Sequence, residues 1–116
     1  MNDIFLILAG CLGMIIAIVH GILGEKQVVR PIRDLPRTAK RVASAVMFLS
    51  ALYWFVGGMV LVASPFYLEA GDRFVAAMIV AAMYLSGMLA NIWATRGRHF
   101  GWALLGAATI LTVAGA

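Results

Sequence analysis

Residues 4–23 read IFLILAGCLGMIIAIVHGIL, an unbroken run without Asp, Glu, Lys or Arg. A helix needs about 20 predominantly apolar residues to cross a hydrocarbon layer of about 30 Å, and this run has that length. Three further runs have the same character, at residues 42–62, 74–93 and 100–116, although the last is shorter. The sequence therefore predicts an all-α protein, a bundle of four transmembrane helices joined by short loops.

The composition of the whole chain agrees with a membrane protein. Hydrophobic residues make up 64% of the 116 residues, charged residues make up 12%, and the mean hydropathy is +0.99. Soluble domains carry about 25% charged residues. A closed β-barrel also satisfies its backbone in lipid, but barrel strands alternate apolar and polar residues, and these runs are apolar all round. Residues 1–116 are therefore expected to form a single integral membrane domain without a soluble part.

The basic residues are concentrated in two of the three links. Of the nine Lys and Arg residues, Arg96 and Arg98 lie between the last two runs, and Arg73 alone lies between the second and third. Links rich in Lys and Arg stay in the cytoplasm, so both termini are expected outside it. The other six, which we expect to contact anionic lipids at the cytoplasmic surface, are Lys26, Arg30, Arg33, Arg37, Lys40 and Arg41.

The first basic link, GEKQVVRPIRDLPRTAKR at residues 24–41, has an amphipathic pattern. At helical spacing its apolar residues share one arc and most of its basic residues share the opposite arc, which is typical of a segment lying at the membrane surface. Pro31 and Pro36 limit any helix because proline removes a backbone donor and disfavours helix just before it. We expect a short turn on the membrane, followed by a new helix capped by Asp34.

Small residues recur every four positions in the first run. Lipid is as apolar as a leucine side chain, so helices in a membrane associate mainly by close packing over small residues. We expect two such faces to contact protein, either within the bundle or in a second copy: Ala9, Gly13, Ala17 and Gly21 in the first run, and Ala82, Ser86 and Ala90 in the third. The lone Cys11 is expected to be buried as a small apolar residue.

Polar side chains near the runs gather at the expected cytoplasmic end. They are His20, Glu25, Ser44, Asn91, Arg96, Arg98 and His99. One interpretation is a binding site in which His20 and Asn91 share a hydrogen bond and the arginines bind a phosphate or carboxylate headgroup. The alternative is that these groups satisfy one another and mark the membrane surface.

Cofactor sites have weaker support. Two histidines, His20 and His99, do not supply the four ligands of a structural zinc site, so no metal is expected, and a haem with histidine ligands stays an alternative. Tyr53, Trp54 and Tyr84 lie near the middle of the membrane. They either form a pocket for a quinone, a pigment or a lipid tail, or pack in the core with their O–H and N–H groups bonded to neighbours.

No catalytic constellation is visible, so we expect no enzymatic activity. No charged residue lies inside the four runs, although proton relays and ion pathways ordinarily use such residues. These features favour a non-catalytic accessory or structural subunit of a larger membrane complex, or a self-associating bundle that binds lipid. The alternatives are a small oligomeric transporter or channel with a polar cytoplasmic mouth, and a membrane protein that binds quinone, haem or pigment.

Two short segments, HGILGE at residues 20–25 and RGRHFGW at residues 96–102, resemble motifs of a group of small four-span proteins of the bacterial inner membrane. The resemblance implies that location, with several membrane spans, and it implies no activity because none is attached to the group. Many members carry a Trp-His pair early in the second span. Val46 and Met47 occupy those positions here, so the resemblance implies no pair of intramembrane histidines.

Overall fold

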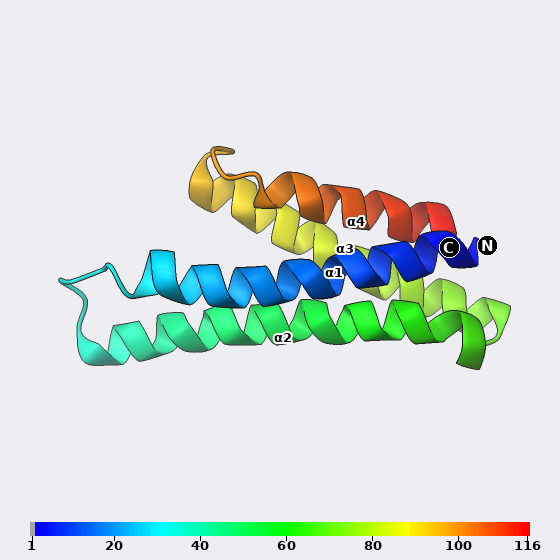
Figure 1. Cartoon of the computed structure of the whole chain (residues 1–116), viewed down its shortest axis with the longest axis horizontal. Helices are drawn as coiled ribbons and strands as arrows, with labels where there is room; N and C mark the ends of the chain where they lie inside the picture. Colours follow the sequence, from blue (N-terminus) through cyan, green and yellow to red (C-terminus); the bar gives the residue numbers. More distant parts are fainter. Residues whose placement is uncertain (1) are drawn as a thin grey trace.

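The computed structural model describes residues 2–116. It confirms the prediction that the protein is all-helical. The described chain is 86% helical and contains no strand. Its four α-helices are α1 (Asp3–Leu23), α2 (Arg37–Tyr67), α3 (Ala70–Thr95) and α4 (Gly101–Gly115), and a π-helix, η1 (Gly24–Val29), continues α1. The helices run alternately up and down, so that both termini lie at one end and the two basic links at the other (Figure 1).

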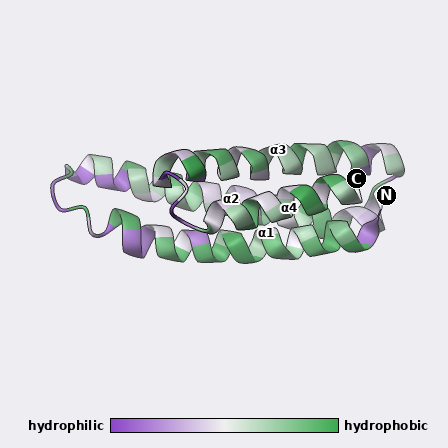
Figure 2. Ribbon diagram, turned by 90° about the horizontal axis from the view of Figure 1, so that it is seen from above, coloured by the Kyte–Doolittle hydropathy of each residue, from purple (hydrophilic) through white to green (hydrophobic). Residues whose placement is uncertain are grey.

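The helices differ in how well they match the thickness of a membrane. The helices α1, α2 and α3 are long and apolar enough to cross a bilayer, and α4 is apolar but shorter. At 1.5 Å per residue, the 15 residues of α4 extend about 22 Å, less than a hydrocarbon layer of about 30 Å. The structure therefore supports three membrane spans by length and a fourth, shorter helix packed beside them. Figure 2 shows hydrophilic residues mainly toward the ends and links.

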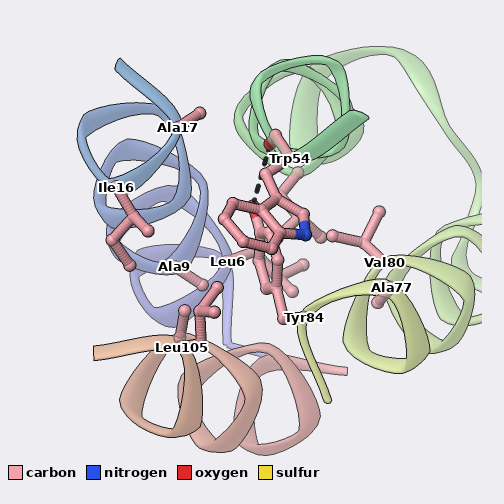
Figure 3. Close-up of a cluster of buried hydrophobic side chains, with 11 residues drawn as sticks. Leu6, Ala9, Ile16, Ala17, Trp54, Ala77, Val80, Tyr84 and Leu105 are labelled. Carbon is pink, nitrogen blue, oxygen red and sulfur yellow. Dashed lines mark hydrogen bonds between the residues drawn. The ribbon is translucent and has the colours of Figure 1, made fainter. Parts of the chain in front are cut away.

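The core is a single cluster between the four helices. Each helix packs on two neighbours in the order α1, α2, α3, α4 and back to α1, so α1 and α3 lie diagonally across the bundle. One large, fully buried side chain comes from each helix, in order Leu6, Leu61, Tyr84 and Leu105. Figure 3 shows Leu6, Tyr84 and Leu105 pointing inward between the helices, with Trp54 beside Tyr84.

The helices α1 and α2 are in backbone contact at two glycines. A Cβ atom placed on Gly10 would lie 2.5 Å from the carbonyl oxygen of Gly58, and one placed on Gly58 would lie 2.6 Å from the carbonyl oxygen of Gly10. Nearer the basic end, a Cβ on Gly24 would lie 2.9 Å from Sδ of Met47. This long hairpin therefore depends on missing side chains for its close packing, as is common for helices in lipid.

Two aromatic residues fill the centre of the bundle. The side chain of Tyr84 lies against Gly13 of α1, where any Cβ would collide with it, and its O–H donates to the backbone carbonyl of Trp54 at 3.5 Å (Figure 3). The indole of Trp54 in turn lies against Gly87 of α3. Each aromatic ring thus occupies the space left by a glycine on another helix, and together they leave the middle of the bundle filled.

The small residues expected to contact protein divide into two classes. On α1, Ala9, Gly13 and Ala17 are buried and Gly21 is half-buried, whereas on α3 Ala82, Ser86 and Ala90 are all exposed in the single chain. The helix α3 packs through Ala77, Ala81 and Tyr84 instead, because the bulky tyrosine takes the inward position opposite Gly13. Cys11 is exposed although the neighbouring Gly10 is buried, so the prediction that Cys11 is buried is wrong.

The first basic link begins as helix. The π-helix η1 carries α1 on through Val29, which is buried, and the backbone N–H of Arg30 donates to the carbonyl of Glu25 at 3.0 Å. The prediction that Asp34 caps α2 is wrong. Pro36 occupies the N-cap position with φ −53° and ψ 148° and no side-chain cap, since its ring presets the backbone for a helix that starts at the next residue.

The end that carries the termini is held together by Arg73. Its guanidinium forms an ion pair with Asp3 of α1 at 2.6 Å and also donates to the carbonyls of Pro65 and Leu68, both at 3.3 Å. The missing N–H of Pro65 leaves the carbonyl of Leu61 without its helical partner, and the Ser64 hydroxyl donates to that carbonyl at 2.9 Å. Arg73 therefore joins α1 to the turn between α2 and α3.

We predict that Gly58→Ala destabilises the bundle and that Gly71→Ala does not. The new methyl at position 58 forces α1 and α2 apart, whereas a Cβ at position 71 meets nothing within 4 Å. Overpacking of this kind lowers the free energy of unfolding by about 1–3 kcal/mol. The measurement is unfolding in mild detergent followed by far-UV circular dichroism. Equal stability of the two variants would contradict the close contact of α1 and α2.

Candidate functional site

The polar residues at the basic end form separate local pairs instead of one cluster. His20 of α1 lies with its Nε2 atom 3.1 Å from Oγ of Ser50 on α2. The hydroxyl of Ser50 donates its own hydrogen to the carbonyl of Met47 at 2.9 Å, so its oxygen accepts from His20 in the tautomer protonated on Nε2. The imidazole also lies against the indole of Trp54, with ring centroids 4.6 Å apart. His20 is therefore a packed, hydrogen-bonded residue of the α1–α2 interface.

The expected hydrogen bond between His20 and Asn91 does not form, because α1 and α3 are diagonal and Ser50 lies on the adjacent helix. The amide nitrogen of Asn91 lies beside Gly101, and its Oδ1 atom is buried without a hydrogen-bond partner in residues 2–116. His99 is exposed and stacks on Phe100, and its Nδ1 accepts from the backbone N–H of Gly101 at 3.1 Å. His99 thus satisfies a free donor in the first turn of α4.

The arginines of the second basic link belong to a closed turn. Arg96 ends α3 in the left-handed conformation with φ 52°, followed by Gly97 with φ 72°. The N–H of Gly97 donates to the carbonyl of Ile92 at 3.0 Å, and the indole N–H of Trp102 donates to the carbonyl of Gly97 at 3.2 Å. The side chains of Arg96 and Arg98 are exposed, so they are available to lipid headgroups and do not enclose a site inside the bundle.

Glu25 and Ser44 form the most specific polar contact at the basic end. The hydroxyl of Ser44 on α2 donates to Oε2 of Glu25 at 2.8 Å, and Nε of Arg30 lies 3.7 Å from Oε1. The Glu25 side chain is 36% exposed. Sequence reasoning names both residues but does not pair them, because their contact depends on η1, and π-helices have no recognisable sequence signal. Such irregular turns are frequent at functional sites.

This pair closes one end of a groove between α1 and α2. The groove has a volume of about 540 Å³ and opens on the outer surface of the bundle. Its floor and walls are apolar and include Ala17, Gly21, Ile22, Phe48, Ala51 and Leu52. Small residues such as Ala17 and Gly21 therefore let α1 and α2 pack closely, and they also leave this groove above the helix contact. The structure thus has an apolar outer groove that ends at the carboxylate of Glu25.

The three mid-membrane aromatic residues do not form a common pocket. Tyr53 is 64% exposed, whereas Trp54 and Tyr84 are buried in the core. Successive helical residues point about 100° apart, so Tyr53 and Trp54 cannot face the same space. Tyr53 instead lines a second groove, of about 480 Å³, between α2 and α3. The buried pair is engaged in packing, and its tyrosine O–H has the carbonyl of Trp54 as its partner.

The basic residues of the first link surround the end of the α1–α2 hairpin. Lys26, Arg30, Arg33, Arg37 and Arg41 are exposed, and Lys40 is half-buried. They lie at the same end as Arg96 and Arg98, and the segment that carries them extends beyond α3 and α4 (Figure 1). In residues 2–116, no three His, Cys, Asp or Glu side chains are grouped so as to hold a metal ion.

Comparisons of the chain with family models, with curated proteins and with solved structures give no match. The site is therefore defined by its own geometry. That geometry consists of an interior filled by side chains, a set of locally paired polar groups, and an apolar outer groove that ends at Glu25 and Ser44.

We predict that Ser50→Ala destabilises the protein more than Ser86→Ala. The first change leaves the imidazole N–H of His20 without its acceptor, which costs about 1 kcal/mol. The second removes an exposed hydroxyl that bonds only to the carbonyl of Met83 in its own helix. Unfolding in detergent measures both free energies, and ¹⁵N NMR of the imidazole reports the tautomer of His20. An unchanged imidazole spectrum in Ser50→Ala would contradict the pairing.

Proposed function

We propose that this protein is a non-catalytic accessory or structural subunit of a larger membrane complex, or a self-associating bundle that binds lipid, and that it binds these partners through its outer surface. The observation that carries the proposal is the contrast between a filled interior and an uncovered exterior. The centre holds Trp54 and Tyr84, each seated against a glycine of another helix. Such a core fills, with side chains, the space that a path for a solute through the bundle would need.

The polar groups support the same interpretation. His20 is bonded to Ser50, Glu25 to Ser44, and His99 to the first turn of α4. All lie toward the basic end, and no charged residue occurs within the central apolar part of any helix. A carrier of ions needs polar groups across the bilayer, so the distribution favours attachment and anchoring over transport.

The outer surface of α3 favours association with another helix. Ala82, Ser86 and Ala90 are all exposed, and the Ser86 hydroxyl bonds to the carbonyl of Met83 in its own helix. A strip of small residues lets a second helix approach closely in lipid. Because the rest of the bundle does not cover this strip, it is the face where we propose that a larger membrane complex, or a second copy of the chain, is bound.

We further propose the inner membrane of a bacterium as the location, with both termini in the periplasm. The two basic links lie at one end of the bundle and the termini lie at the other (Figure 1). Excess Lys and Arg favours the cytoplasmic side. Arg73, the one Lys or Arg side chain at the opposite end within residues 2–116, is held by Asp3 and by two carbonyls, so it is largely neutralised and weakly opposes this orientation.

We predict that Ala82→Phe or Ala90→Phe abolishes assembly and that Ala45→Phe preserves it. The bulky ring separates helices that meet over α3, whereas Ala45 is an exposed alanine on α2 outside that face. Native mass spectrometry after extraction in mild detergent reports the mass and stoichiometry of each complex. A wild-type protein that is solely monomeric under these conditions, or assembly that survives both α3 changes, would contradict the proposal.

A further inference from the structure

We propose that the groove between α1 and α2 binds one phospholipid whose headgroup carries a primary ammonium, of the phosphatidylethanolamine class, with Glu25 as the acceptor for the ammonium. The proposal goes beyond the accessory role and does not depend on a protein partner. It needs only that the hairpin lie in a membrane with its basic end at the surface.

The body of the groove fits an acyl chain. Its volume of about 540 Å³ lies within the range of roughly 300–1,000 Å³ typical of small-molecule pockets. Its walls are almost wholly apolar, and the groove opens outward between two helices long enough to cross a membrane. In that position it faces the hydrocarbon layer, so the ligand with direct access is a lipid tail. Gly21 and Ala51 keep the floor low enough for a chain to lie along it.

The polar end of the groove distinguishes between headgroups. A site for a purely anionic lipid needs only cations, but here a carboxylate lies at the groove's end. Ser44 donates to one oxygen of Glu25, while Nε of Arg30 lies 3.7 Å from the other, too far for a hydrogen bond. The carboxylate therefore retains free acceptor positions and is held in place by Ser44. An ammonium donates a charge-assisted hydrogen bond to such an acceptor, which is roughly twice as strong as a neutral one.

A phosphate beside the ammonium needs a cation near the carboxylate. Arg30 is already next to Glu25, and Lys40 lies one helical turn before Ser44, on the same face of α2 and half-buried. Within residues 2–116, Lys40 forms no ion pair. A carboxylate next to Arg30, with Lys40 one turn from its partner Ser44, is complementary to a zwitterion whose ammonium and phosphate are close neighbours. A choline headgroup has the same charges but no N–H, so it cannot donate to Glu25.

The test is lipid retention measured by native mass spectrometry. The purified full chain is delipidated in mild detergent and titrated with ethanolamine, choline and glycerol phospholipids that carry identical acyl chains. We expect one ethanolamine lipid to be retained about tenfold more tightly than either of the others, the effect of one charge-assisted hydrogen bond. Equal retention of the choline lipid, or preference for the anionic glycerol lipid, would overturn the proposal.

Variants separate the headgroup from the tail. Glu25→Gln should remove the preference for the ethanolamine lipid, while Glu69→Gln, an exposed glutamate at the opposite end, should retain it. Leu52→Trp partly fills the groove and should weaken the binding of all three lipids. Circular dichroism checks that each variant is folded. A Glu25→Gln protein that still prefers the ethanolamine lipid refutes the assignment. Ala82→Phe leaves the groove intact, so loss of a protein partner and loss of the lipid are measured independently.

Discussion

The structure depends on the inability of hydrocarbon to solvate charge or unpaired backbone groups. That constraint requires continuous helices and removes the hydrophobic force that would otherwise bring them together. In place of the hydrophobic force, the chain uses close packing at glycine: α1 and α2 touch through Gly10 and Gly58, and Tyr84 fits against Gly13. Backbone groups stay paired even at Pro65, where the Ser64 hydroxyl donates to the carbonyl of Leu61 that the proline leaves free.

The apolar runs were sufficient to predict four helices and the ends that carry charge, because run length and charge placement are local properties. The neighbours of each helix were not predictable in the same way. One interpretation of the sequence paired His20 with Asn91, but α1 and α3 are diagonal and Ser50 of α2 is the partner. The outward position of Ala82, Ser86 and Ala90 likewise depends on Tyr84 taking the inward face of α3, which spacing of small residues alone does not reveal.

The contact of Glu25 with Ser44 shows how a local irregularity creates a site. The sequence between residues 24 and 41 predicts an interrupted amphipathic segment, yet α1 continues as a π-helix and brings a carboxylate against α2. The same glycines and alanines that allow α1 and α2 to pack also leave the groove that ends at this carboxylate. Close packing and the lipid groove therefore have a common origin, and the exposed face of α3 is a separate surface available for protein association.

The central claim is that both basic links face the cytoplasm while the termini and the turn between α2 and α3 face the opposite side. Single cysteines at Arg33→Cys, Arg98→Cys and Gly71→Cys, each in a Cys11→Ser background, test it with a membrane-impermeant thiol reagent on intact bacterial cells with a permeable outer membrane. The account predicts labelling at position 71 in intact cells, and at positions 33 and 98 only after the inner membrane is opened. Labelling of positions 33 and 98 from opposite sides would contradict it.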